Sequence, residues 1–275
     1  HFGLTMAYKS VLIYLSGYSK SQISNYALSF SQEFASQLLV YHVLPDPRDS
    51  IPLLGEGVSV MMIEDIVEAA SKESKLRRNN AREDFKKFVE IAEKKFGQSA
   101  KKAISTPIWE ENSGLIDEIL SSRGRLVDLI ISPKPNKKEH MSETLAFNSF
   151  LFNTGRPLLI VPSHKQQGYC NKTVVVSWNG SAETAKSIGY AIPILKKALQ
   201  VHLFIAPSNP GKVVSSIDIN QYLNIHGIKN IINYNVESKR LEGTELLSYA
   251  ESVNANLIVM GAFTRSRMRQ FILGG

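Results

Sequence analysis

Short runs of consecutive apolar residues recur along the chain, and segments with apolar residues at helical spacing separate them. Such runs are typical of strands in a parallel sheet that helices cover on both faces. They occur in both halves of the 275 residues. The predicted strands are residues 11–14, 38–43, 127–131, 155–162, 173–176, 201–205 and 257–260.

The order of these elements repeats. Residues 11–34, a strand followed by a helix, parallel residues 173–199, and the helix and strand within 115–131 parallel those within 246–260. The polar segment 163–171, without apolar periodicity, indicates a linker. The repeat predicts two tandem doubly wound parallel-sheet α/β domains, with ligands at the carboxyl ends of the strands where the strand order reverses. The predicted domains are residues 8–163 and 171–275.

The first half contains a helical insertion at about residues 58–96, where apolar residues recur at helical spacing. Its middle, residues 72–82, carries Lys75, Arg77 and Arg78. A nucleic-acid patch and a solvated helix face are the alternatives. Because no aromatic side chains interleave with these charges, we favour the solvated face. Further along, Asp218 is predicted to be the N-cap of a helix over residues 220–226.

Composition limits the chemistry. The net charge of +7 suits anionic ligands without requiring nucleic acid. Cys170 is the only cysteine, so the sequence predicts neither a disulfide framework nor a thiolate zinc site. The histidines lack the spacing of a metal motif. His42 and His202 lie in predicted strands, where we expect hydrogen-bonded core or edge imidazoles rather than ligands. Since no apolar run approaches the ~20 residues of a membrane span and no cleavable signal is visible, we expect a cytoplasmic protein.

Two strand-to-helix junctions in the second half are the candidate site. After residues 173–176 comes Asn179-Gly180-Ser181, where Ser181 is a good N-cap. After residues 257–260 comes Gly261, which allows close approach of a ligand to the backbone, and then a basic amphipathic helix. A helix start favours an anion such as phosphate. A tight turn with nothing bound is the alternative, and Asn-Gly is itself a standard turn signal.

These junctions resemble the universal stress protein A family, in its tandem-domain form, which belongs to the adenine-nucleotide α-hydrolase-like folds. In that family an Asp-x-Ser or Asp-Gly-Ser turn ends the first strand, and a Gly-x-x-Gly-(nine residues)-Gly-Ser/Thr motif after the fourth strand binds the phosphates. Here Gly261 and Thr264 are followed by nine residues and then Gly274 and Gly275. The spacing matches, whereas Thr264 and Gly275 replace a glycine and a Ser/Thr.

The resemblance implies ATP or another adenine nucleotide as ligand, with Mg²⁺ accompanying it. It places Asn179 near the ribose or base, with the Gly180–Ser181 helix start beside it. It assigns Phe204, in the strand 201–205, to the apolar edge of the adenine pocket. In the phosphate loop, Gly261 opens the turn, Arg265 and Ser266 reach the phosphates, and Gly274 and Gly275 let the chain pass close behind them. The arginines are alternatively the exposed side of a basic helix.

The first half departs further from the motif. Pro133 stands in the place of Gly261, Pro135 follows, and proline lacks a donor N–H. Ser16 and Gly17 offer no carboxylate or amide at the first turn. We therefore expect nucleotide in the second half alone.

Two classes of function follow. One is a stress-response or regulatory protein in which nucleotide occupancy alters partner binding, with at most weak hydrolysis. The other is a nucleotide-independent interaction scaffold. An enzyme of the wider superfamily fits less well, because no general base or nucleophile is identifiable. The family also dimerises through fifth strands, and we expect the apolar edge at residues 158–161 to be covered by a second chain in a homodimer or by residues beyond Gly275.

Overall fold

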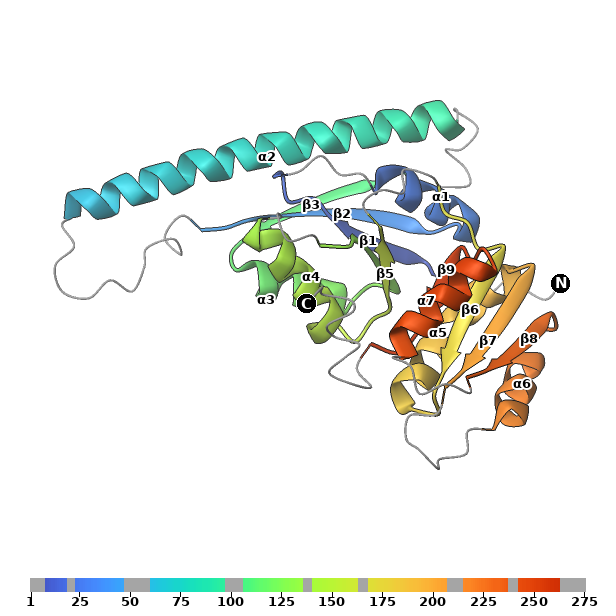
Figure 1. Ribbon diagram of the computed structural model, residues 1–275. Helices are drawn as coiled ribbons and strands as arrows, with labels where there is room; N and C mark the ends of the chain where they lie inside the picture. The colour runs from blue at the N-terminus through green and yellow to red at the C-terminus, as the bar shows by residue number, and fades with distance from the viewer. Residues whose placement is uncertain are drawn as a thin grey trace. The chain divides into compact units, whose positions relative to one another are not determined.

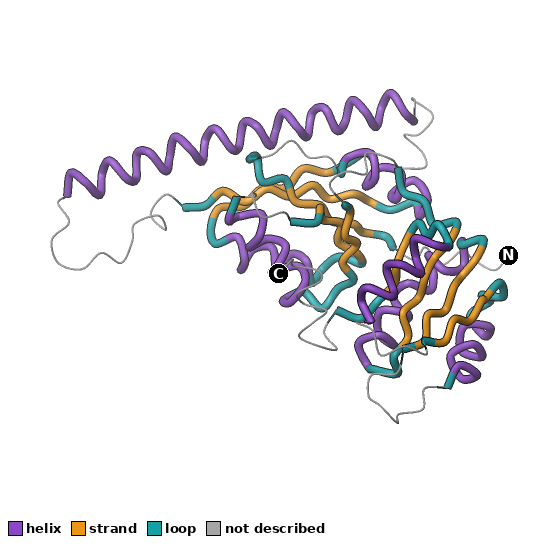
Figure 2. The backbone as a smooth tube through the Cα atoms, in the orientation of Figure 1, coloured by secondary structure: helices purple, strands orange, loops and turns teal. Residues whose placement is uncertain are grey.

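A computed structural model describes residues 8–18, 23–46, 60–96, 106–135, 140–162, 168–206, 215–236 and 242–262. The chain divides into two compact units, His1–Tyr169 and Cys170–Gly275. Each unit has one parallel sheet whose strands alternate along the chain with helices (Figure 1). Strands and helices of each unit are distinguished by colour in Figure 2. The predicted fold class, two tandem parallel-sheet α/β domains, is confirmed.

The sheet of the N-terminal unit has five strands, in the order β3-β2-β1-β4-β5. Its edge strands are β3 (Ile108–Ser113) and β5 (Leu158–Val161). Between them lie β2 (Gln37–Leu44), β1 (Ser10–Tyr14) and β4 (Leu129–Pro133), and every neighbouring pair is parallel. The connecting helices are α1 (Ser24–Phe34), α2 (Val60–Phe96), α3 (Ile116–Gly124) and α4 (Met141–Asn153).

The C-terminal unit repeats this arrangement with four described strands in the order β8-β7-β6-β9. Its central strands are β6 (Thr173–Trp178) and β7 (Gln200–Ile205), with β8 (Ile231–Asn235) and β9 (Leu257–Val259) on either side. All pairs are again parallel. The described helices are α5 (Ala182–Lys197), α6 (Ser216–Ile225) and α7 (Glu242–Ser252).

The central strands carry the core. Three consecutive residues of β1 (11–13) and three of β6 (174–176) are fully buried, because helices cover both faces of a parallel sheet. In the N-terminal unit Leu12, Val43 and Ile130 from three strands pack with Leu120 of α3 and Phe150 of α4. This burial explains the continuous apolar runs from which the central strands were predicted.

The edge strands β3 and β8 were not predicted. Their residues are mostly half-buried or exposed. The sequences Ile-Trp-Glu-Glu-Asn-Ser and Ile-Ile-Asn-Tyr-Asn therefore contain polar residues where a central strand has apolar ones. A strand with one neighbour needs no apolar residues on both faces, so the apolar-run signal is weak there.

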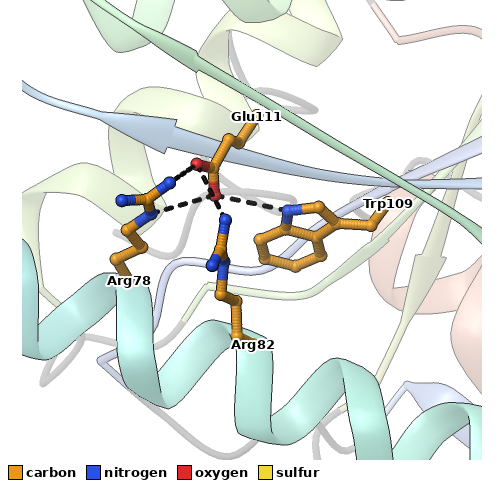
Figure 3. A network of polar contacts seen from close by, with 4 residues as sticks. All are labelled: Arg78, Arg82, Trp109 and Glu111. Atoms are coloured by element: carbon orange, nitrogen blue, oxygen red, sulfur yellow. Dashed lines mark hydrogen bonds and ion pairs between the residues drawn. The ribbon is translucent and has the colours of Figure 1, made fainter.

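The helical insertion is one uninterrupted helix, α2, and only part of its charged middle is a solvated face, since Lys75 is exposed whereas arginines of this stretch contact the unit. Arg77 is only 5% exposed, and its guanidinium lies 4.2 Å from the centre of the Tyr18 ring. The next residue, Arg78, and Arg82 one turn after it bind the carboxylate of Glu111 in β3 (Figure 3). The arginines face the unit because they have a carboxylate, backbone oxygens and an aromatic ring to bind there.

Two further local outcomes concern helix ends and membranes. The N-cap of α6 is Ser215, whose Oγ accepts the N–H of Asp218 at 3.1 Å, so the prediction of Asp218 as N-cap was wrong by one turn.

Within the described ranges neither α2 nor any shorter helix carries the apolar stretch that a membrane span requires.

Candidate functional site

The strand order of the C-terminal unit reverses between β6 and β9. From β6 the chain continues to β7 and β8 on one side, and β9 is added later on the other side. In open α/β sheets the carboxyl ends of the two strands at such a reversal flank the usual ligand crevice. Asn179 directly follows β6, and Gly261 lies two residues after β9. The two predicted junctions therefore meet at the same point of the fold.

Asn179 forms the turn at the end of β6 and is 7% exposed. Its Oδ1 accepts the N–H of Ser181 at 3.0 Å and the hydroxyl of Thr184 at 3.0 Å. Between them Gly180 has φ +74°, the left-handed conformation that favours glycine. The acceptor of the Asn179 side chain is thus occupied within the protein. Its amide group, Nδ2, makes no hydrogen bond to the part of the chain that the structure describes.

Ser181 begins α5 as its N-cap, as predicted from the sequence. Its Oγ accepts the N–H of Thr184 at 3.2 Å. Thr184 was not singled out from the sequence, yet it is buried and bonds both Asn179 and Ser181. The available signal was a hydroxyl residue three positions after a serine N-cap, where capping partners commonly stand.

Gly261 packs directly against the first turn of α5. A Cβ at this position would lie 2.9 Å from the backbone nitrogen of Thr184 and 3.0 Å from the carbonyl carbon of Glu183. Real Cβ atoms do not approach backbone atoms so closely, so the fold itself requires glycine here. The space that the sequence assigned to a ligand is, at this atom, filled by the helix start.

The charges around this point have opposite effects on an anion. The first turn of α5 has N–H groups without intrahelical acceptors and the positive end of the helix dipole. The exposed carboxylate of Glu183 is on the same turn, and its Cβ would lie 3.1 Å from a Cβ on Gly261. A free phosphate would be repelled by this negative charge, and Mg²⁺ bound to the phosphate would reduce the repulsion. Among the described residues no three His, Cys, Asp or Glu are grouped to hold a metal ion themselves.

Phe204 belongs to the core. Its side chain is 1% exposed and packs with Val175, Leu246 and Ala250. The ring stacks on Tyr234, with centroids 5.6 Å apart. The structure therefore places this side chain under α7 and away from solvent. Other predicted site residues, Arg265, Ser266, Gly274 and Gly275, lie outside the described residues, as does Thr264.

The equivalent reversal in the N-terminal unit, between β1 and β4, is occupied by side chains of α2 and α4. Ser16 donates its hydroxyl proton to Glu143 Oε1 at 2.6 Å. Asn80 Nδ2 donates to the carbonyl of Gly17 at 3.1 Å, and Arg77 Nε donates to the carbonyl of Ser16 at 3.3 Å. The turn after β1 has no carboxylate or amide side chain of its own. Glu143 and Asn80, which are distant in sequence, supply these groups.

Packing also closes the strand reversal between β1 and β4. Gly17 has φ +77°, and a Cβ there would clash with the backbone oxygen of Arg77. The Tyr18 ring contacts the Arg77 guanidinium and stacks on the His140 ring, whose centroid is 3.6 Å away. In the same region burial raises the pKa of Tyr14 to about 12, although the charge of Arg77 acts in the opposite direction. The phenol of Tyr14 is therefore neutral at physiological pH.

In each of the two strand histidines, one ring nitrogen has a hydrogen-bond partner and the other has none in the described part of the chain. His42 Nδ1 lies 2.6 Å from the carbonyl oxygen of Leu15, and His202 Nδ1 lies 2.8 Å from the hydroxyl of Tyr249. Burial lowers the pKa of both imidazoles, so both are neutral at pH 7. Each Nε2 is buried without a hydrogen-bond partner in the described part of the chain. Both rings lie inside strands, as expected of core residues.

Comparison with known proteins finds the fold but no sequence relative. No family model matches the chain, and no curated protein matches it. Among solved structures, a universal stress protein from Archaeoglobus fulgidus DSM 4304 is similar, with a TM-score of 0.60 and 15% identity over 90% of this chain and 85% of that one. A putative universal stress protein from Pseudomonas aeruginosa UCBPP-PA14 has a TM-score of 0.51 and 12% identity over 99% of this chain and 88% of that one. The chain therefore has the universal stress protein fold, in a tandem arrangement of two parallel sheets.

Proposed function

We propose that the protein is a stress-response or regulatory protein whose C-terminal unit binds an adenine nucleotide. The observation that carries this proposal is the meeting of the Asn179 turn, the start of α5 and Gly261 at the strand reversal. Ligands bind at such reversals in open α/β sheets, and helix starts favour phosphates. Binding, rather than catalysis, is the proposed role.

The described groups suggest how the ligand would be held. The Asn179 amide is available as a donor to a ribose hydroxyl or a base nitrogen, since Oδ1 is already engaged by Ser181 and Thr184. The Thr184 N–H is capped by Ser181, which leaves the N–H groups of Ala182 and Glu183 in the first turn for an oxygen of the ligand. We propose that residues 264–275 complete the phosphate loop.

Glu183 makes this proposal dependent on a cation. The Cβ of this residue packs against Gly261 and its carboxylate is exposed on the first turn of α5, so we expect Mg²⁺ to strengthen nucleotide binding by screening the phosphates from this charge. In Glu183→Gln, binding of ATP without Mg²⁺ should become several-fold tighter, and the gain from adding Mg²⁺ should shrink. Glu251→Gln, an exposed change on α7 of the same unit, is the control. An identical Mg²⁺ dependence in wild type and Glu183→Gln would contradict this arrangement.

The direct test is the ligand content of protein purified from cells. Acid release followed by chromatography should yield ATP, ADP or AMP in an amount approaching one per chain. Asn179→Ala should lose most of this nucleotide while retaining its circular dichroism spectrum. Folded protein that contains no nucleotide and takes up none when ATP and Mg²⁺ are added would contradict the proposal.

An interaction scaffold is the second candidate, and one surface favours it. Between α6 and β8 lies a shallow depression lined by Ile217 and Ile225 and by amides that include Asn220, Asn224 and Asn233. Both isoleucines are more than 70% exposed. An uncharged surface of this kind suits a protein partner. Loss of partner binding in Ile217→Asp, with nucleotide content unchanged, would favour this function.

A further inference from the structure

The first part of α2 projects from the N-terminal unit. An α-helix rises 1.5 Å per residue, so the 37 residues of α2 span about 55 Å, whereas the five residues of β1 span about 17 Å. Among the described α2 side chains those that are buried are Arg77, Ala81 and Phe88. The end of α2 that begins at Val60 extends past the sheet of its own unit (Figure 1). Residues 61–76 are called the projecting segment below.

The projecting segment exposes apolar side chains on one side. Met62 is 55% and Leu76 60% exposed, and Met61 beside them is exposed as well. Met62, Ala69 and Leu76 are spaced by seven residues, so they lie along nearly the same line of the helix. A line of this kind is typical of a helix that packs against another helix.

Charges along the segment change sign at its middle. Glu64, Asp65 and Glu68 precede Ala69, whereas Lys72 and Lys75 follow it. Lys72 also pairs with Glu68 of its own helix at 2.7 Å, and Glu73 is engaged with the Tyr18 hydroxyl. A second identical segment running parallel would set acid against acid. Running antiparallel, it would set the acidic part of each copy against the basic part of the other.

The positions of complementary residues have centres within one residue of each other. The midpoint of Met62 and Leu76 is residue 69, and the midpoints of the pairs 65/75 and 68/72 are both residue 70. A twofold axis near Ala69–Ala70 therefore brings apolar residues together at the ends and opposite charges between them. The small side chain of Ala69 at this centre allows two helices to approach closely.

We propose that a second copy of this chain binds the projecting segment, so that two α2 helices pair antiparallel about Ala69–Ala70. The interface is isologous, as expected of a twofold dimer. About 16 residues of each helix take part, a length of about 24 Å, so the dimer is weak and forms at micromolar concentrations. It does not depend on nucleotide binding and uses a surface distinct from the edge strand β5.

Sedimentation equilibrium of the full chain at about 5 to 500 µM tests this dimer. The wild type should dimerise, and Asp65→Lys and Lys75→Glu should each weaken it by about tenfold because like charges then face each other. The double variant carrying both changes should recover the wild-type affinity. Lys86→Glu, an exposed reversal on the second half of α2, should leave the affinity unchanged.

A cross-link checks the centre independently of affinity. In a Cys170→Ser background, Ala69→Cys should form an interchain disulfide on mild oxidation, since residue 69 meets its own copy at the axis. A monomer throughout the concentration range overturns the proposal. So does a dimer that both charge reversals leave intact, or one that only a change in β5 such as Ile160→Lys disrupts.

Discussion

Two glycines at the strand reversals make room for helices of the protein itself. Gly17 lies against the backbone of Arg77 in α2, and Gly261 lies against Glu183 and Thr184 in α5. The sequence shows a glycine after a strand, but it does not show what approaches it. Ligand and helix both require a missing Cβ, so the residue type alone cannot distinguish them.

Alanine substitutions separate a packed glycine from an unpacked one. Gly261→Ala should lower the free energy of unfolding by about 1–3 kcal/mol, because its Cβ would overlap the first turn of α5. Gly189→Ala, on an exposed position within α5 with nothing within 4 Å of the new Cβ, should raise it by about 0.5–1 kcal/mol. Urea unfolding measures both. A Gly261→Ala protein as stable as Gly189→Ala would show that β9 does not pack as described.

Buried His42 predicts acid sensitivity. Burial lowers its pKa in the folded protein, and Arg77 nearby adds to the shift, whereas an unfolded His titrates near its ordinary value of about 6.5. Below that pH the unfolded chain binds a proton that the folded protein excludes, so stability is complete above about pH 6.5 and falls as the pH decreases. Between pH 7.5 and 5.5 the loss should be on the order of 1 kcal/mol for this residue.

The measurement is urea unfolding at both pH values for wild type and His42→Asn. Asparagine retains a donor for the Leu15 carbonyl but does not titrate, so the difference between the two pH values should shrink in the variant. An equal loss in both proteins would show that His42 does not cause the pH dependence.

At the scale of elements, burial decides what the sequence reveals. Central strands β1 and β6 were predictable because both faces are covered, and α2 was predictable from its periodicity. The face that α2 turns to its unit was not predictable. Its partner Glu111 lies in an edge strand without an apolar run, and only the fold brings that strand beneath the helix.

The Glu111 network should hold α2 on β3. Burial raises the pKa of this carboxyl, but the hydrogen bond and charge of Arg78, followed by Arg82 and the Trp109 N–H, lower it overall. Glu111→Gln should therefore destabilise the N-terminal unit by about 1 kcal/mol, since the groups are partly exposed. Amides around Arg78 and Arg82 should exchange faster. Glu118→Gln, an exposed change on α3, should have no such effect, and equal exchange in both variants would exclude a role for the network.

At the scale of the whole molecule, one architecture carries two different strand reversals. The C-terminal reversal has Asn179 and Gly261 with an amide donor available. The N-terminal reversal is filled by Arg77, Asn80 and Glu143. From the sequence, Pro133 in place of a glycine indicated a difference between the halves. The sequence could not show that side chains of α2 and α4 fill this reversal. These residues are about 60 to 130 positions away from the turn after β1.

The most direct test of the account is the stoichiometry of nucleotide binding. Calorimetric titration of the full chain with ATP and Mg²⁺ should give one site per chain. Asn179→Ala should weaken that site strongly, and Ser16→Ala at the N-terminal reversal should leave it unchanged. Two equivalent sites per chain, no binding at all, or a site that Ser16→Ala removes and Asn179→Ala preserves would contradict a nucleotide site confined to the C-terminal unit.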